Sequence, residues 1–132
     1  ALPEKAEDDD LLSSLPYPEQ LPPWLSEADL EFYANEFSNS TMRGPINYYR
    51  NHDLTWEMTE GAPTEILQPA MFLAGTNDGV VMMAAEAIKA MPHFVKDLRI
   101  NHMIEGIGHW TQQEAPNEVN NQILAFLKDV DS

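Results

Sequence analysis

The sequence predicts an α/β fold in which parallel strands alternate with flanking helices. Residues 69–75 form a continuous apolar run, Pro-Ala-Met-Phe-Leu-Ala-Gly, which is typical of a strand buried on both faces of a parallel sheet. A helical pattern, a second strand-like segment and another helical pattern follow in that order. The order strand, helix, strand, helix implies parallel strands that are joined by right-handed crossovers.

The first 25 residues are predicted to be irregular, because they combine five prolines with a run of acidic side chains. One helical turn is expected at residues 11–15. Asp8, Asp9 and Asp10 are interpreted as part of a solvated loop, because the spacing and the glycine of an EF-hand calcium loop are absent.

A helix is predicted to start after Ser26, with that serine as N-cap and Asp29 as the acid three residues later. Leu30, Tyr33 and Phe37 place apolar side chains on one face at helical spacing. The helix should end near residue 38, where short polar side chains compete for backbone hydrogen bonds.

Pro45 is predicted to be the first residue of a second helix, which runs through Asn51 and continues toward Met58. A loop is expected from Gly61. The next helix is predicted over residues 80–91, with Pro92 stopping it, and the second strand over residues 98–104. The last helix begins near Pro116, and its predicted buried stripe contains Val119, Ile123, Phe126 and Leu127.

Two parallel strands by themselves leave uncovered edges, and buried sheets normally contain more strands. We therefore expect neighbouring strands from outside this chain.

Composition excludes several classes of function. The formal net charge of −15, from 22 acidic and 7 basic residues, argues against nucleic acid or an anionic membrane surface as a partner. No apolar run approaches the roughly 18 residues that span a bilayer, and the acidic start lacks the apolar stretch of a signal peptide. Together with the absence of cysteine, this leads us to expect a cytoplasmic protein.

Asp78 and His109 are the candidates for chemistry. Each follows a predicted strand by a few residues, at the carboxyl ends that face the ligand crevice of an open α/β sheet. An imidazole can take a proton from a hydroxyl or a water, and a carboxylate behind it fixes its tautomer. Gly106 and Gly108 allow a tight turn around the histidine.

A metal site is not expected, because His52, His93, His102 and His109 form neither an i, i+4 pair nor a His-Glu-x-x-His pattern. No glycine-rich phosphate loop is present, and we expect no cofactor. The amides of residues 111–113 are expected to brace the histidine loop. Met82 and Trp110 are interpreted as substrate-binding side chains, with core filling as the open alternative.

Three segments resemble epoxide hydrolases of the α/β-hydrolase fold. Gly106-Ile-Gly-His-Trp-Thr-Gln-Gln-Glu-Ala-Pro116 is similar to their catalytic-histidine segment, and Leu73-Ala-Gly-Thr-Asn-Asp78 to the segment of their charge-relay acid. Arg43-Gly-Pro-Ile-Asn-Tyr-Tyr-Arg-Asn51 resembles the segment between lid and core. The resemblance implies the C-terminal part of that fold, with a partial helical lid at residues 1–43 and part of the core at residues 44–132.

The resemblance also implies roles for three residues. His109 would activate water, Asp78 would orient the histidine, and Tyr49 would donate a hydrogen bond to the epoxide oxygen. The adjacent Tyr48 points elsewhere on a helix. A small apolar epoxide is the implied substrate.

The aspartate nucleophile of the family has no match in this chain. Asp29 and Asp53 lie in helical context without flanking small residues, and Asp97 lies after the acid. The nucleophile is therefore expected on an N-terminal portion of the same hydrolase, either covalently attached or present as a separate chain. A homodimer is a further possibility.

Two alternatives stay open at this stage. One is a haloalkane or haloalkanoate dehalogenase, or an esterase, that has the same fold, acid and base. The other is a non-catalytic module whose acidic surface binds another protein.

Overall fold

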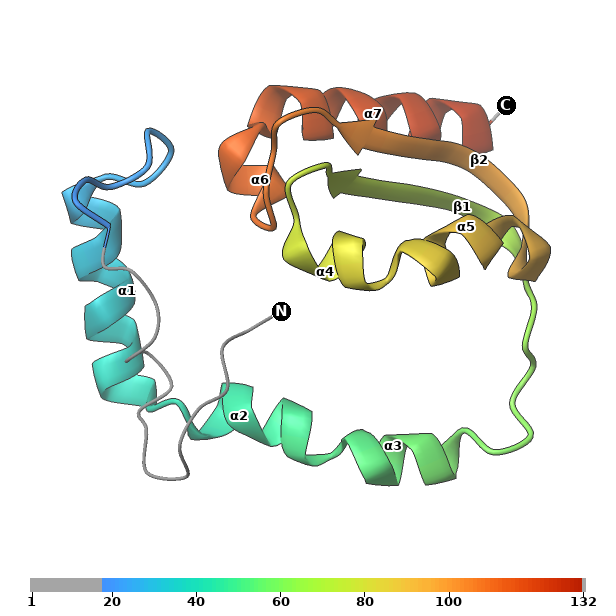
Figure 1. The fold of residues 1–132 in the computed structure, drawn as a ribbon, viewed down its shortest axis with the longest axis horizontal. Coiled ribbons are helices and arrows are strands. Elements are labelled where there is room, and N and C mark those ends of the chain that lie inside the picture. Colours follow the sequence, from blue (N-terminus) through green and yellow to red (C-terminus); the bar gives the residue numbers. More distant parts are fainter. Residues whose placement is uncertain (1–17, 132) are drawn as a thin grey trace. The chain divides into compact units, whose positions relative to one another are not determined.

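The computed structural model describes residues 18–131 (Figure 1). The predicted helical turn at residues 11–15 and the acidic run Asp8–Asp10 lie outside the described residues. The chain divides into two compact units, residues 1–39 and 40–132. The predicted boundary between residues 43 and 44 stays a prediction.

The first unit contains most of helix α1, Glu27–Ser40. Its start confirms the predicted capping box: the Asp29 amide donates to Ser26 Oγ at 3.2 Å, and the Ser26 amide donates to Asp29 Oδ2 at 3.0 Å. The Ser26 hydroxyl also donates to Asp29 Oδ2. This bond first, and the bond from the Ser26 amide second, lower the pKa of the Asp29 carboxyl. The helix ends two residues later than predicted, before Thr41, whose φ of 63° is left-handed.

The predicted second helix is two helices, α2 (Arg43–Arg50) and α3 (His52–Met58), with Asn51 between them. The prediction that it begins at Pro45 was wrong by two residues. Proline is tolerated at the third position because the amides of the first turn have no partner within the helix.

The remaining elements form the α/β part of the second unit. They are β1 (Ile66–Gly75), α4 (Gly79–Met83), α5 (Ala85–Phe94), β2 (Val95–Ile104), α6 (Thr111–Glu114) and α7 (Pro116–Val130). The strands β1 and β2 pair in parallel, with Gly75 opposite Ile104 at their carboxyl ends. In the view of Figure 1, α7 runs along one side of the strand pair and α4 and α5 along the other. The predicted α/β fold with parallel strands is confirmed.

Two details of the crossover differ from the prediction. The helix expected over residues 80–91 is interrupted at Ala84, where φ is −94° and ψ is 12°. Pro92 was expected to stop the helix, but it lies inside α5, which continues to Phe94. A proline in the last turn removes one hydrogen bond to the preceding turn, and its fixed φ is compatible with a helix.

The core of the described residues is small. Its buried apolar side chains are Ala74, Val95, Ile104 and Val119. The stripe predicted along α7 is buried only in part, because Ile123 and Leu127 are 37% and 51% exposed. The apolar run of β1, predicted to be buried on both faces, is buried only at its carboxyl end. A sheet of two strands is too narrow to cover these side chains.

Candidate active site

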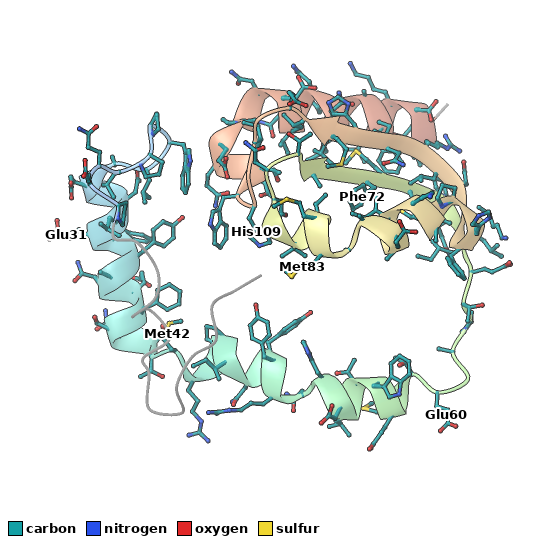
Figure 2. All side chains as sticks on the ribbon, viewed as in Figure 1. Glu31, Met42, Glu60, Phe72, Met83 and His109 are labelled. Atoms are coloured by element: carbon teal, nitrogen blue, oxygen red, sulfur yellow. The ribbon has the colours of Figure 1, made fainter. Side chains whose placement is uncertain are left out.

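The candidate site lies where β1 and β2 end. Because the strands are parallel, their carboxyl ends share one edge, and the turn Thr76–Asp78 therefore meets the loop of residues 105–110. Figure 2 shows His109 at this end of the strand pair, close to the start of α4.

The structure brings Asp78 and His109 together. His109 Nδ1 lies 2.9 Å from Asp78 Oδ2 in a hydrogen bond. The second carboxylate oxygen, Oδ1, accepts the amide of Val80 at 2.8 Å and caps α4. Asp78 is buried, at 8% exposure, whereas the His109 side chain is 57% exposed. The acid is thus held by the fold while the base remains accessible.

The hydrogen bond from His109 lowers the pKa of the Asp78 carboxyl, and the backbone bond from Val80 adds to that effect, against the opposing effect of burial. Asp78 is therefore ionised at neutral pH. An ionised carboxylate at Nδ1 favours the tautomer that carries its proton on Nδ1, which leaves Nε2 as the nitrogen that can accept a proton.

Three further hydrogen bonds join the two loops. The Asn77 amide donates to the carbonyl of Ile107 at 2.9 Å, and its side-chain Nδ2 donates to the carbonyl of Gly106 at 3.1 Å. The Gly106 amide donates to Thr76 Oγ1 at 2.9 Å. The loop of His109 is consequently attached to the loop of Asp78 independently of the pair itself.

Two positions at this edge of the sheet require glycine: Gly106 in the histidine loop and Gly75 at the end of β1. Gly106 has a φ of 75°, a left-handed conformation that side chains rarely adopt, as its place in the turn predicted. At Gly75, the last residue of β1, a Cβ atom would lie 2.5 Å from the carbonyl oxygen of Gly108. Gly75 therefore lets the histidine loop pass directly over the end of the strand.

Glu114 is a site residue that the sequence prediction missed. Its Oε2 accepts the amide of Gly108 at 2.8 Å, and its Oε1 accepts the amide of Trp110 at 3.0 Å. Among residues 111–113, which were expected to brace the loop, Thr111 Oγ1 donates to the neighbouring Gln112 side chain; Glu114 accepts the two loop amides. The capping-box pattern, an acid a few residues after a helix start, could have indicated it.

The predicted substrate-binding residues are exposed in this chain. Trp110 is 55% exposed, and its ring meets His109 edge-on with centroids 5.3 Å apart. Met82, on α4, is 65% exposed, so neither side chain fills the core of the described part. Tyr49 lies on α2 at 70% exposure, with its ring 5.6 Å from that of His52. No interaction joins it to Asp78 or His109 among the described residues, so its role stays a prediction.

No metal-binding cluster and no membrane-spanning helix is found among residues 18–131. They contain no group of three or more His, Cys, Asp or Glu side chains that could hold a metal ion. A hollow of about 800 Å³ is lined by side chains from the segment 56–64 and by none of the predicted site residues. Within the same residues, no helix is long and apolar enough to cross a membrane.

The relatives found by comparison with known proteins are epoxide hydrolases. The chain is 39% identical over 123 residues to epoxide hydrolase B of Mycobacterium tuberculosis, which covers 92% of this chain and 35% of that protein. No protein-family model matches the chain.

Solved structures give the same result. An epoxide hydrolase from an endophytic Streptomyces is similar with a TM-score of 0.80 and 42% identity, over 85% of this chain and 34% of that one. Epoxide hydrolase A from Mycobacterium thermoresistibile is similar with a TM-score of 0.78 and 38% identity, over 86% and 35%. The chain thus spans about a third of the length of these three relatives, 35% in the case of the Mycobacterium tuberculosis protein.

Proposed function

We propose that this chain, a homologue of the C-terminal portion of the α/β-hydrolase-fold epoxide hydrolases, supplies the water-activating part of an active site that converts epoxides to vicinal diols. The observation that carries the proposal is the hydrogen bond of 2.9 Å between His109 Nδ1 and the buried carboxylate of Asp78. A buried acid behind an accessible imidazole is the arrangement that general-base catalysis needs.

The first step of the proposed reaction forms a covalent intermediate. An aspartate carboxylate attacks an epoxide carbon, the carbon–oxygen bond breaks, and the ring oxygen takes the electron pair. The product is an alkyl-enzyme ester. Tyr49 donates a hydrogen bond to the oxygen as its negative charge develops, and a phenol in a dry site is suited to that role.

The second step releases the diol. His109 takes a proton from water through Nε2, and the resulting hydroxide attacks the carbonyl carbon of the ester. The acyl carbon–oxygen bond breaks, and the released alkoxide takes the remaining proton of the attacking water, which regenerates the aspartate carboxylate. The imidazolium returns its proton to the oxygen that was freed in the first step, and the neutral diol leaves. Asp78 stays ionised, because its hydrogen bond with His109 lowers its pKa, and it stabilises the imidazolium that forms.

The nucleophile in this proposal belongs to an N-terminal portion of the same hydrolase, attached to this chain or present as a separate one. No aspartate of the sequence lies in the Gly-x-Asp-x-Gly or Gly-x-Asp-x-Ala setting of a strand-to-helix elbow. The exposed apolar side chains of β1 and α7 support this proposal, because the N-terminal portion could cover them. They include Ile66, Leu67, Leu124 and Leu127, which are 49% to 68% exposed.

The substrate class in the proposal is a small apolar epoxide. Two of the side chains near the pair are apolar: Trp110 directly follows His109, and Met82 lies on the helix that Asp78 caps. Such side chains favour an apolar ligand and offer no charged group to a polar one.

The test combines the chain with its N-terminal portion and styrene oxide. A single turnover in H₂¹⁸O is expected to give unlabelled diol and to place the label in the aspartate, because water attacks the ester carbonyl. His109→Gln is expected to stop turnover and to accumulate the ester, seen by mass spectrometry as an N-terminal portion heavier by one substrate. His93→Gln, a change of an exposed histidine on α5, is the control.

The alternatives predict other results. Haloalkane or ester turnover without epoxide turnover would indicate another hydrolase of the same fold. If the protein isolated from its source has no companion portion by intact-mass spectrometry and no epoxide turnover, the proposal is wrong and a non-catalytic binding role is favoured.

A further inference from the structure

Glu114 binds the backbone on both sides of His109. The amides of Gly108 and Trp110 donate to its two carboxylate oxygens, at 2.8 Å and 3.0 Å. Hydrogen bonds to an ionised acceptor are roughly twice as strong as those between neutral groups. Because these amides belong to the residues before and after His109, the two bonds restrain the peptide groups on either side of its Cα.

A simpler role for Glu114 would be to cap the short helix α6. Its bond to Trp110, the N-cap residue of α6, fits that role. The bond to Gly108 does not, because Gly108 lies outside the helix and beyond His109. The fit at Gly108 is also close, since a Cβ atom there would lie 3.0 Å from Glu114 Oε1.

The end of β1 also restrains the loop. Gly75 lies directly beneath the carbonyls of Ile107 and Gly108, and Asn77 donates its amide to Ile107 at 2.9 Å. The loop is therefore held at two places, by the strand end at Ile107 and by the Glu114 carboxylate at Gly108 and Trp110. With its backbone restrained in this way, the imidazole reaches Asp78 from a defined position.

We propose that Glu114 is a positioning residue for His109, which sets the place of the imidazole by binding the amides of Gly108 and Trp110. The inference rests on the proposed role of His109 as the base. It adds that the base is held by two carboxylates of different function: Asp78 at the ring and Glu114 at the backbone.

Two variants and a matched control test this inference. Glu114→Gln keeps one acceptor oxygen and loses the second, whereas Glu114→Ala loses both. Glu105→Gln removes the same charge from an exposed glutamate of the same loop. The first readout is the ¹⁵N spectrum of the His109 ring in the whole chain, which reports the tautomer. We expect an Nδ1–H ring in the wild type and in Glu105→Gln, and mixed tautomers in both Glu114 variants.

The second readout is turnover of styrene oxide by the chain with its N-terminal portion. A misplacement of about 1 Å costs on the order of a hundredfold in rate, so we expect kcat to fall about tenfold in Glu114→Gln and about a hundredfold in Glu114→Ala. KM should change less than about twofold, because Glu114 does not touch the substrate in this proposal. Glu105→Gln should leave both constants unchanged.

Wild-type ring spectra in both Glu114 variants would overturn the inference and leave Glu114 as a cap of α6. If Glu114→Ala does not fold, the ring spectrum of Glu114→Gln alone tests whether Glu114 positions His109. If the wild-type complex does not turn over styrene oxide, the proposed function fails, and the tautomer measurement still decides whether Glu114 positions His109.

Discussion

Gly75 and Ile107 are in such close contact that a Cβ atom on Gly75 would collide with the carbonyl oxygen of Ile107. Gly75 ends the strand that leads to Asp78, and Ile107 lies in the loop that carries His109. The packing of a strand end against a loop backbone thus determines how near the two functional side chains come to each other.

Gly75→Ala is therefore expected to destabilise the protein, because neither backbone can move without breaking the bonds between the loops. Overpacking of this kind typically costs about 1–3 kcal/mol of unfolding free energy. Urea denaturation measures it. Gly79→Ala is the control, since a Cβ atom at Gly79 would meet nothing within 4 Å. Equal midpoints for the two variants would contradict the close contact.

The Asp78–His109 bond should make stability depend on pH in the acid range. The pKa of Asp78 is lowered in the folded state, so its contribution is fully present above its unfolded pKa of about 3.9 and is lost as pH falls through the folded value. Asp78→Asn should therefore lower the urea midpoint at pH 6 and change it much less at pH 2. The exposed Asp53→Asn on α3 is the control, and a constant difference for Asp78→Asn at both pH values would refute the linkage.

Ser26→Ala should weaken the start of α1. It removes the Oγ that accepts the Asp29 amide, and the loss of such a cap costs about 1 kcal/mol. Faster hydrogen exchange of the amides in the first turns of α1 would report the change. Ser38→Ala is the comparison within the same helix, because Ser38 Oγ donates to the carbonyl of Ala34 and caps nothing.

Tyr49→Phe is expected to lower kcat for an epoxide in the complete enzyme, because it removes a donor to the developing oxygen charge. Loss of one such donor costs on the order of a hundredfold. Tyr48→Phe removes the same hydroxyl from the neighbouring residue of α2 and should leave kcat unchanged. Equal effects of the two substitutions would assign the loss to packing of the helix.

Local patterns allowed much of this fold to be predicted. The capping box of Ser26 and Asp29 and the apolar run that becomes β1 are determined by neighbouring residues, so the sequence displays them directly. The approach of Asp78 to His109 could be predicted because parallel strands bring their carboxyl ends to one edge.

The parts that could not be predicted depend on contacts between distant segments. The loop that crosses Gly75 comes some thirty residues later in the chain; the bond from Gly106 to Thr76, for example, joins residues 30 positions apart. Nothing near Gly75 in the sequence indicates this crossing. Glu114 was missed because α6 has only four residues, so the sequence did not predict the short helix whose start its carboxylate caps. The prediction that Pro92 stops the helix was wrong because proline usually ends a helix, whereas the last turn of α5 tolerates it.

The pairing of Gly75 with Ile104 has a consequence for the folding of this protein. A slip of one residue between the strands would shift the loop of His109 by about 3.3 Å and turn every side chain of β2 to the opposite face. The bond between His109 and Asp78 can then form only when the strands are aligned. The tautomer of one imidazole would therefore act as a sensor of strand alignment, which distinguishes a correctly assembled sheet from a misaligned one before any substrate is added.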